Sequence, residues 1–255
     1  VRMIADDLVT FIKDDLNIFG IGVLLLLIIA LSIIFRQIRW IILPIITCSL
    51  SVIATAGVLG MFGWEVTVIS SNFISLQLIL TMAITIHLIV RYRELVLAKP
   101  QASQKELLVE TVDFISKPCL YTVLTTIAGF ASLMFSGILP VINFGWMMSV
   151  GVVISLFMTF LIVPTVMMQM GKLVPKSVNS SFMLTHYLAI VTQNFKKSIP
   201  IISLILFAVS IGGSLMLKVE NSFIDYFKPS TEIYQGLSII DKKLGGTTPL
   251  DITIT

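Results

Sequence analysis

Long apolar runs separated by short polar segments dominate the hydrophobic pattern of the chain. A helix needs roughly 20 apolar residues to cross a hydrocarbon core of about 30 Å, and several runs approach or exceed that length without an acidic or basic residue. The runs predict membrane spans at Ile18–Phe35, Ile41–Phe62, Thr67–Val90, Cys119–Phe135, Val141–Met170 and Ile199–Leu217. We therefore predict an all-α polytopic membrane bundle with six transmembrane helices in this chain.

Lysine and arginine are distributed unevenly between the connections. Three connections contain them: Arg36 and Arg39; Arg91, Arg93, Lys99, Lys105 and Lys117; and Lys172, Lys176, Lys196 and Lys197. The two short loops "GWEV" and "SGILP", which alternate with these connections, contain none. Because cytoplasmic loops carry an excess of Lys and Arg, we predict that the three basic connections are cytoplasmic and that both ends of the chain lie outside.

Two polar segments near the cytoplasmic side have helical patterns. "ASQKELLVETVDFIS" opens with Ser103 and Glu106 at the spacing of a capping box and continues with an apolar face, which favours a helix lying at the membrane interface. "THYLAIVTQNFKKSIP" has a similar pattern. One interpretation treats both segments as connectors between spans, and the alternative gives them a role in coupling.

The ends of the chain differ in character from the middle. "STEIYQGLSIIDKKLGG" predicts an amphipathic helix starting at Ser230, and "TTPLDITIT" has the alternation of a strand. We expect these residues to begin an extracytoplasmic α/β domain at the C-terminus that continues beyond Thr255. The head, "VRMIADDLVTFIKDDL", resembles the end of another such domain. The chain is thus interpreted as a piece of a longer protein.

Composition supports a membrane protein and makes other classes improbable. The chain is 56% hydrophobic and 12% charged, against about 25% charged residues in soluble domains. Its net charge of +3 needs no nucleic-acid partner, since the basic residues lie at the ends of spans. The 14 acidic residues all fall outside the predicted spans, which argues against intramembrane aspartyl proteases and metalloproteases. A Ser/His hydrolase stays open by residue type, although no G-x-S-x-G pattern occurs. We expect no enzyme activity, metal or cofactor.

Polar residues in the third predicted span form a stripe. Ser70, Gln77, Thr81 and Thr85 fall within an arc of about 60° at 3.6 residues per turn, so the stripe should face other helices or water rather than lipid. His87 lies about 120° away on the same helix. Two interpretations stay open: these residues hold helices together, or they belong to a transport or coupling path.

Small residues at helical spacing indicate candidate packing positions. Ala56 and Gly60 form a pair in the second predicted span. The fourth predicted span carries Thr125, Gly129 and Ser132 on one face. Because small residues let helix backbones approach closely, we interpret all five positions as helix-packing residues.

Specific motifs resemble those of a known superfamily. "RYRE" closes the third predicted span, and "LTTIAGFASL" in the fourth is followed by "FG" at the start of the fifth. The chain resembles the resistance-nodulation-division (RND) superfamily, specifically its MMPL-like and sterol-sensing-domain-like bacterial members. The resemblance implies twelve spans in two repeats of six, in the bacterial inner membrane, with both ends of this chain periplasmic.

The same resemblance implies a division of the chain. Residues 1–16 would end a first periplasmic domain, 17–175 would hold transmembrane helices two to six, and 176–198 would form a cytoplasmic interfacial linker. Residues 199–217 would be helix seven and 218–255 the start of a second periplasmic domain.

The implied function is export of a hydrophobic or lipid-like substrate, with membrane lipids as partners; a homo-oligomer is compatible with this interpretation. The third predicted span would correspond to the helix that usually carries the proton-relay acid, at a position near Ala83, but it contains no Asp or Glu. Three explanations stay open. An acid lies in the second half alone; another ion, or a path through Thr81, Thr85 and His87, serves instead; or the protein is a non-pumping lipid-binding sensor of the sterol-sensing type.

Overall fold

The computed structural model describes residues 2–64, 67, 70–172, 183–196, 198–217, 234–236 and 238–239. The chain divides into two units, Val1–Ser177 and Val178–Thr255. The first unit holds the helices that build the candidate site, and the second begins after α5.

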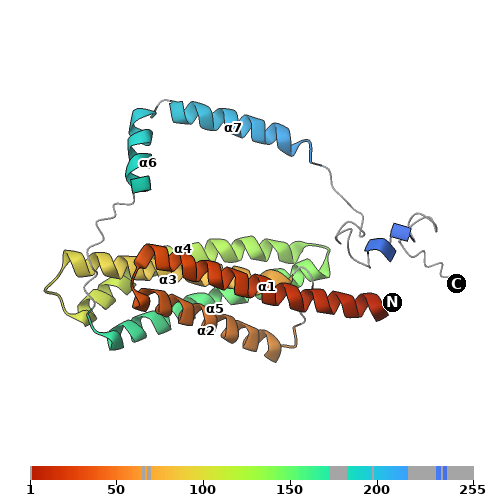
Figure 1. The fold of residues 1–255 in the computed structure, drawn as a ribbon, viewed down its shortest axis with the longest axis horizontal. Coiled ribbons are helices and arrows are strands. Elements are labelled where there is room, and N and C mark those ends of the chain that lie inside the picture. Colours follow the sequence, from red (N-terminus) through yellow and green to blue (C-terminus); the bar gives the residue numbers. More distant parts are fainter. Residues whose placement is uncertain are drawn as a thin grey trace. The chain divides into compact units, whose positions relative to one another are not determined.

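Five long helices make up the described part of the first unit (Figure 1). They are α1 (Arg2–Phe35), α2 (Ile38–Met61), α3 (Phe73–Ala98), α4 (Gln104–Ser132) and α5 (Leu139–Met170), with short 3₁₀ turns η1 (Ser70–Asn72) before α3 and η2 (Leu133–Phe135) after α4. Each long helix contains a stretch that is long and apolar enough to cross a membrane. The chain is therefore a multi-pass membrane protein, and the first five predicted spans are confirmed as such helices.

Helix α3 lies at the centre of this bundle. It packs against α1, α2, α4 and α5, and its side chains Leu88, Ile89 and Tyr92 are at most 1% exposed. Side chains on the outside of the bundle are apolar and exposed, as with Ile29 at 61% and Phe157 at 73%, which suits contact with lipid tails. Polar groups on the inner faces of α3 are consequently surrounded by protein.

Helix α4 joins two elements that the sequence predicts separately. The predicted interfacial helix and the fourth predicted span form one continuous helix from Gln104 to Ser132. The Ser103 side chain caps it by accepting a hydrogen bond from the Glu106 backbone N–H at 3.3 Å, as the capping-box spacing predicts. Pro118 lies inside the helix, and the helix continues through it.

Helices α4 and α5 approach each other closely near the η2 turn that lies between them. A Cβ atom added to Gly145 would lie 2.7 Å from the backbone oxygen of Phe130, so only glycine permits this separation. The rings of Phe130 and Phe144 pack edge to face at 5.9 Å between centroids, a favourable geometry for aromatic pairs. Together these contacts fix the position of α5 against α4.

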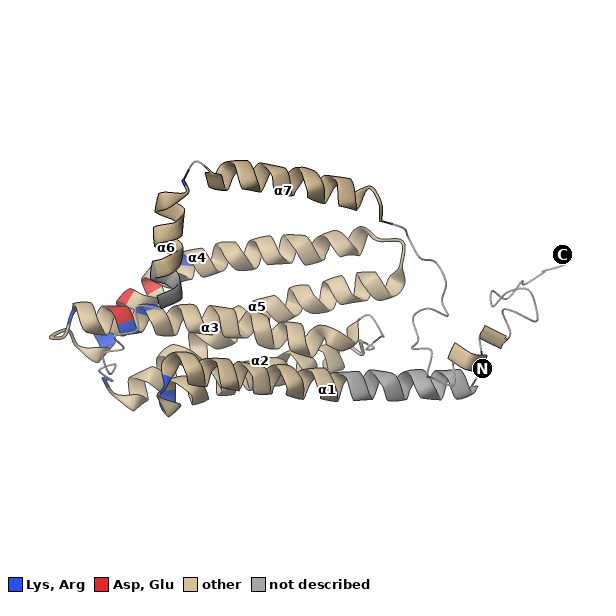
Figure 2. Ribbon diagram, turned by 45° about the horizontal axis from the view of Figure 1, so that its top comes forward, with Lys and Arg blue, Asp and Glu red and all other residues tan. Residues whose placement is uncertain are grey.

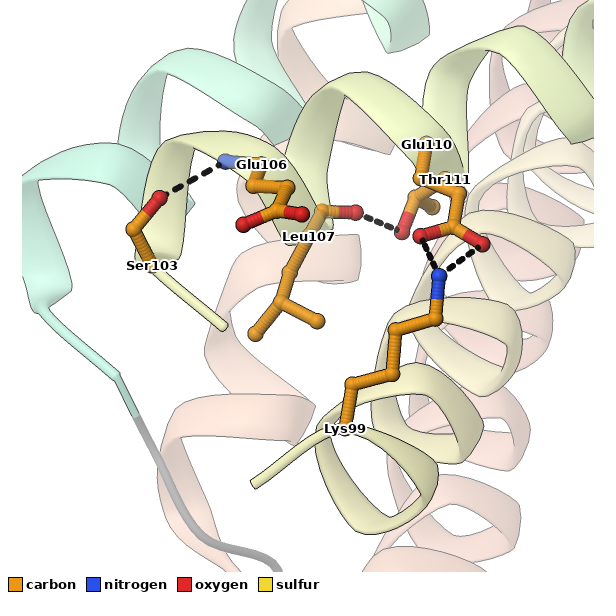
Figure 3. A network of polar contacts seen from close by, with 6 residues as sticks. All are labelled: Lys99, Ser103, Glu106, Leu107, Glu110 and Thr111. Atoms are coloured by element: carbon orange, nitrogen blue, oxygen red, sulfur yellow. Dashed lines mark hydrogen bonds and ion pairs between the residues drawn. The ribbon is translucent and has the colours of Figure 1, made fainter. Parts of the chain in front are cut away.

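Charged side chains gather at one end of the bundle, where α1 meets α2 and α3 meets α4 (Figure 2). Lys99 forms an ion pair with Glu110 at 2.7 Å (Figure 3), and Lys172 donates to the backbone oxygens of Pro100 and of Ala102, the latter at 2.8 Å. This is the end that the Lys and Arg distribution predicts to be cytoplasmic.

An uncharged chain of hydrogen bonds also crosses that end. The Tyr92 hydroxyl donates to Oε1 of Gln104 at 2.7 Å, and Nε2 of Gln104 donates to the backbone oxygen of Met167 at 2.8 Å. The ring of Trp40 packs against that of Tyr92, with centroids 6.0 Å apart. These contacts connect α2, α3, α4 and α5 at the charged end of the bundle.

The second unit contains α6 (Met183–Asn194) and α7 (Ser198–Ser214). Helix α6 overlaps the second segment predicted to be helical at the cytoplasmic side and begins two residues before it. Helix α7 coincides with the sixth predicted span, but its 17 residues are at the lower limit for crossing a membrane, so the sixth span stays a prediction. Residues 234–236 and 238–239 are helical, as the sequence predicts there, while most of the predicted α/β domain lies outside the described residues.

The head of the chain is helical throughout its described part. Residues 2–16 belong to α1, the same helix that holds the first predicted span. They therefore continue directly into the membrane-spanning stretch from Ile18 to Phe35.

Candidate functional site

A column of polar side chains follows the inner face of α3. Gln77, Thr81 and Thr85 lie one turn apart, and all three are fully buried. Ser70, the first member of the predicted stripe, is also buried, but it lies in η1 and its hydroxyl contacts Thr67 rather than the rest of the column. The stripe thus faces other helices, as expected, and its inner three members form the candidate site.

Helices α2 and α5 bring matching polar residues to this column. Ser51 and Thr55 on α2, and Ser155 and Thr159 on α5, are all fully buried. The Thr81 hydroxyl lies 2.8 Å from that of Ser155 and 3.3 Å from that of Ser51. Further along, the hydroxyls of Thr85 and Thr159 are 3.5 Å apart. Three membrane helices therefore share one polar interface.

Sequence analysis missed the α2 and α5 members of this interface. The signal was available, because Thr47, Ser51 and Thr55 are spaced four residues apart, as are Gly151, Ser155 and Thr159. Side chains four apart lie on one face of a helix. The same spacing on three spans indicates faces that can meet, although it does not say which spans are neighbours.

The side-chain amide of Gln77 lies at the centre of the interface. Its Nε2 atom is 2.7 Å from the backbone oxygen of Gly151 and 3.2 Å from the hydroxyls of both Ser51 and Thr55. A fourth oxygen, the hydroxyl of Ser155, lies 2.5 Å away. The Gly151 carbonyl only accepts hydrogen bonds, which places the amide nitrogen rather than the amide oxygen on this side.

Three hydroxyls around Gln77 lie within hydrogen-bond distance of carbonyls of their own helices. Thr55 donates to the Ser51 backbone oxygen at 2.9 Å, Ser155 to that of Gly151 at 2.9 Å, and Thr81 to that of Gln77 at 2.7 Å. Hydroxyls also pair across the interface, Ser155 with Ser51 at 3.2 Å and with Thr81 at 2.8 Å, and either atom of each pair could donate. The interface is therefore a network in which hydroxyls of three helices bond to one another and to Gln77.

The other end of the Gln77 amide has no such partners. Its Oε1 atom is buried and accepts no hydrogen bond in the described part of the chain. It lies against Gly151, where an added Cβ would collide with it. A buried carbonyl without a donor is unfavourable by about 1–3 kcal/mol, so the interface holds Gln77 in an orientation that satisfies only half of its amide.

Comparison with known proteins decides the family. The model of the MMPL family matches residues 2–193, which covers α1 to α5 and nearly all of α6. The chain belongs to the MMPL family. The resemblance seen in the "RYRE" and "LTTIAGFASL" motifs is thereby confirmed. A comparison with curated proteins finds no match for this MMPL chain.

The remaining predicted site residues of this MMPL protein lie apart from the polar interface. His87 and Ala83 are exposed on the outer surface of α3. Ala83, near the position implied for a relay acid, therefore does not face Gln77, and His87 makes no contact with Thr81 or Thr85. The interface contains no side chain that titrates near neutral pH.

The predicted packing residues are also outside the bundle's interior. Ala56, Gly60, Thr125, Gly129 and Ser132 are all exposed in the first unit, and a Cβ at Gly60 or Gly129 would meet nothing within 4 Å. The hydroxyls of Thr125 and Ser132 bond to carbonyls of their own helix. Among the described helices, close packing falls on Gly145 and Gly151, and the interpretation of the other five as packing residues stays a prediction.

Proposed function

We propose that this MMPL protein is a transporter that exports a hydrophobic or lipid-like substrate from or across the inner membrane. Membership of the MMPL family carries the proposal. The buried polar interface between α2, α3 and α5 supports it, because polar groups within a membrane are costly and tend to be retained for function. A structural role for the interface is compatible with transport, since helices that move must keep a defined register.

The proposed orientation places the charged end of the bundle in the cytoplasm and both ends of the chain in the periplasm. Arg36 and Lys99 lie in the connections at that end, Arg39 in the first turn of α2 and Arg91 in the last third of α3, and cytoplasmic ends of spans are enriched in such residues. A substrate exported by this protein would then leave the cytoplasmic leaflet or pass through the bundle toward the periplasm.

A second candidate is a lipid-binding sensor that does not pump. The observation that favours it is the position of the acidic residues in the five candidate spans. Glu94 in α3 and Glu106, Glu110 and Asp113 in α4 all lie toward the α3–α4 connection, and the rest of these spans contains no Asp or Glu. Proton-driven transport requires a titrating group on the path of the proton. The sensor predicts saturable binding of lipid without net movement of it.

Reconstitution of the full-length protein into liposomes separates the two candidates. The liposomes carry a fluorescent short-chain phospholipid analogue or the lipophilic dye Nile red, and a proton gradient or a sodium gradient is imposed in turn. We expect redistribution of a probe between leaflets or compartments under one of the gradients, and none in liposomes without protein. Folded protein that binds the probes but never redistributes them would favour the sensor and reject the transporter.

A further inference from the structure

Three arginines meet at the corner where α1 ends and α2 begins beside α3. Arg36 lies in the connection between α1 and α2, and Arg39 lies in the first turn of α2. Arg93 belongs to α3, five residues before that helix ends. These three residues are called the arginine corner below.

Two contacts between helices bring the arginine corner to one level of the bundle. The guanidinium carbon of Arg93 lies 5.0 Å from the centroid of the Phe35 ring, at the last residue of α1. The first turn of α2 packs beside the same part of α3, because the ring centroids of Trp40 and Tyr92 are 6.0 Å apart. Three positive charges therefore lie together at the charged end of the bundle.

No carboxylate neutralises the arginine corner within the described part of the chain. Arg91 pairs with Glu94, and Lys99 pairs with Glu110, so these acidic residues already have partners. In Figure 2, the acidic residues of the charged end lie at α3 and α4, and the α1–α2 connection is basic only. Asp15 is the last acidic residue of α1, and it lies about 30 Å along the helix from Phe35. The corner keeps its positive charge.

The guanidinium of Arg93 is held in place but has no acceptor. A guanidinium has five N–H donors, and those of Arg93 bond to no described residue; its Nε is buried without a partner. Arg91 differs, because it stacks on Phe114 at 3.9 Å and also donates to Glu94 at 3.1 Å. Stacking on Phe35 limits the movement of Arg93 and leaves its N–H donors for an outside anion.

The backbone of Arg36 has an unusual conformation. Its φ is 50°, in the left-handed region, which glycine adopts more easily than any residue with a Cβ. Residues in such conformations occur often at functional sites. The side chain of Arg36 is exposed. The turn thus presents a charged side chain at a position where glycine would be less strained.

Apolar side chains surround the arginine corner on the outside of the bundle. Ile33 is 65% exposed and Ile38 is 70% exposed, one before and one after Arg36 in the chain. Exposed apolar side chains of a membrane bundle contact lipid tails. A partner of this corner should therefore combine an anionic group with apolar chains.

From these observations we propose that the arginine corner binds the phosphate of an anionic phospholipid such as phosphatidylglycerol. The forked guanidinium bonds to phosphate through two parallel N–H groups, and basic pockets between membrane helices bind anionic headgroups. The acyl chains lie along Ile33 and Ile38. A zwitterionic headgroup fits less well, because its ammonium group would meet three positive charges. The bound lipid joins α1, α2 and α3 and is separate from any exported substrate.

The experiment compares two arginines of α3 that differ in one respect. Arg93 and Arg91 are both half-buried, and each stacks on a phenylalanine ring. Only Arg91 has a carboxylate partner. Arg93→Gln therefore removes a charge from the arginine corner, and Arg91→Gln is the matched control for losing a stacked arginine on the same helix.

The melting temperature of the purified full-length protein is measured in detergent with added dioleoylphosphatidylglycerol, dioleoylphosphatidylcholine or inorganic phosphate. A ligand of the folded state raises the melting temperature until its site is saturated. We expect phosphatidylglycerol to raise it more than phosphatidylcholine does in the wild type and in Arg91→Gln, and this extra gain to be lost in Arg93→Gln. Equal gains from both lipids in the wild type would overturn the proposal. So would the same extra gain in the two variants.

Two further outcomes keep the test decisive. Inorganic phosphate that reproduces the whole gain would reject the lipid and indicate a site for free phosphate. If Arg93→Gln does not fold, the exposed Arg36 is replaced instead, and native mass spectrometry counts the phosphatidylglycerol molecules that stay bound. Fewer retained molecules in Arg36→Gln than in Arg91→Gln support the site, and equal retention rejects it. None of these measurements depends on transport.

Discussion

Gly151 and Gln77 depend on one another across the interface between α5 and α3. The glycine leaves space for the Gln77 carboxamide, and its backbone oxygen accepts the 2.7 Å hydrogen bond that orients the amide. Nothing in the α5 sequence marks Gly151 as different from other small residues. Its role comes from a side chain 74 residues earlier in the chain.

Replacing Gly151 with alanine should destabilise the bundle. The added Cβ would collide with Oε1 of Gln77, and overpacking of this kind typically costs about 1–3 kcal/mol. Gly129→Ala is the control, because a Cβ there meets nothing within 4 Å and alanine favours a helix over glycine. Thermal unfolding of the purified protein should show a lower melting temperature for Gly151→Ala and not for Gly129→Ala. Equal effects of the two substitutions would show that contact with Gln77 does not restrict residue 151 to glycine.

Replacing Thr81 with alanine distinguishes a structural from a functional role of the polar interface. The Thr81 hydroxyl bonds to its own helix and to Ser155, and such contacts in membrane proteins contribute about 0.6–2 kcal/mol. If the hydroxyl only holds helices together, stability should fall by less than about 2 kcal/mol and transport should be retained. Loss of probe movement in liposomes, with normal unfolding, would place Thr81 on the coupling path instead.

Among the elements, α4 is the helix whose start the sequence predicts but whose full length it does not. The capping-box spacing correctly predicts where the helix begins, because a cap depends on residues within one turn of each other. The same sequence suggests a boundary between a surface segment and a span, yet the helix is continuous through Pro118. Hydropathy changes along α4, but the helix does not end at Pro118, although proline removes a backbone hydrogen bond there.

Removing the cap of α4 should weaken its first turn. Ser103→Ala deletes the acceptor for the Glu106 N–H, and loss of an N-cap typically costs about 0.5–2 kcal/mol. Amide hydrogen exchange of residues 105–107 should accelerate, whereas Ser116→Ala, which removes a hydroxyl bonded to the Asp113 backbone oxygen, should leave that turn protected. Unchanged exchange in Ser103→Ala would mean that the ion pair of Lys99 with Glu110 holds the turn without the cap.

For the whole molecule, the orientation in the membrane follows from where the charges lie. Lys105 lies in the first turn of α4, beside the connection that contains Lys99, while Phe62 follows the last residue of α2 and is 72% exposed. In intact cells, a membrane-impermeant maleimide should label Phe62→Cys, and should label Lys105→Cys only after the inner membrane is opened. The native Cys48 and Cys119 are buried, so they should contribute little background. The reverse pattern of labelling would invert the proposed topology.

The sequence by itself determined the first five membrane-crossing helices, the charged end and the polar face of α3. Each is a local property: membrane thickness sets the length of an apolar run, and helical spacing places Gln77, Thr81 and Thr85 on one face. The family followed from short motifs in the same way.

Only the tertiary structure decided which faces meet. It brought Ser51, Thr55, Gly151 and Ser155 around Gln77, from positions 22 to 78 residues away along the chain, and it left the small residues of α4 on the outside. Spacing within one helix describes a face but not its neighbour. The choice of neighbour depends on how side chains from separate helices fit together, as the Gln77 amide fits against a residue without a Cβ.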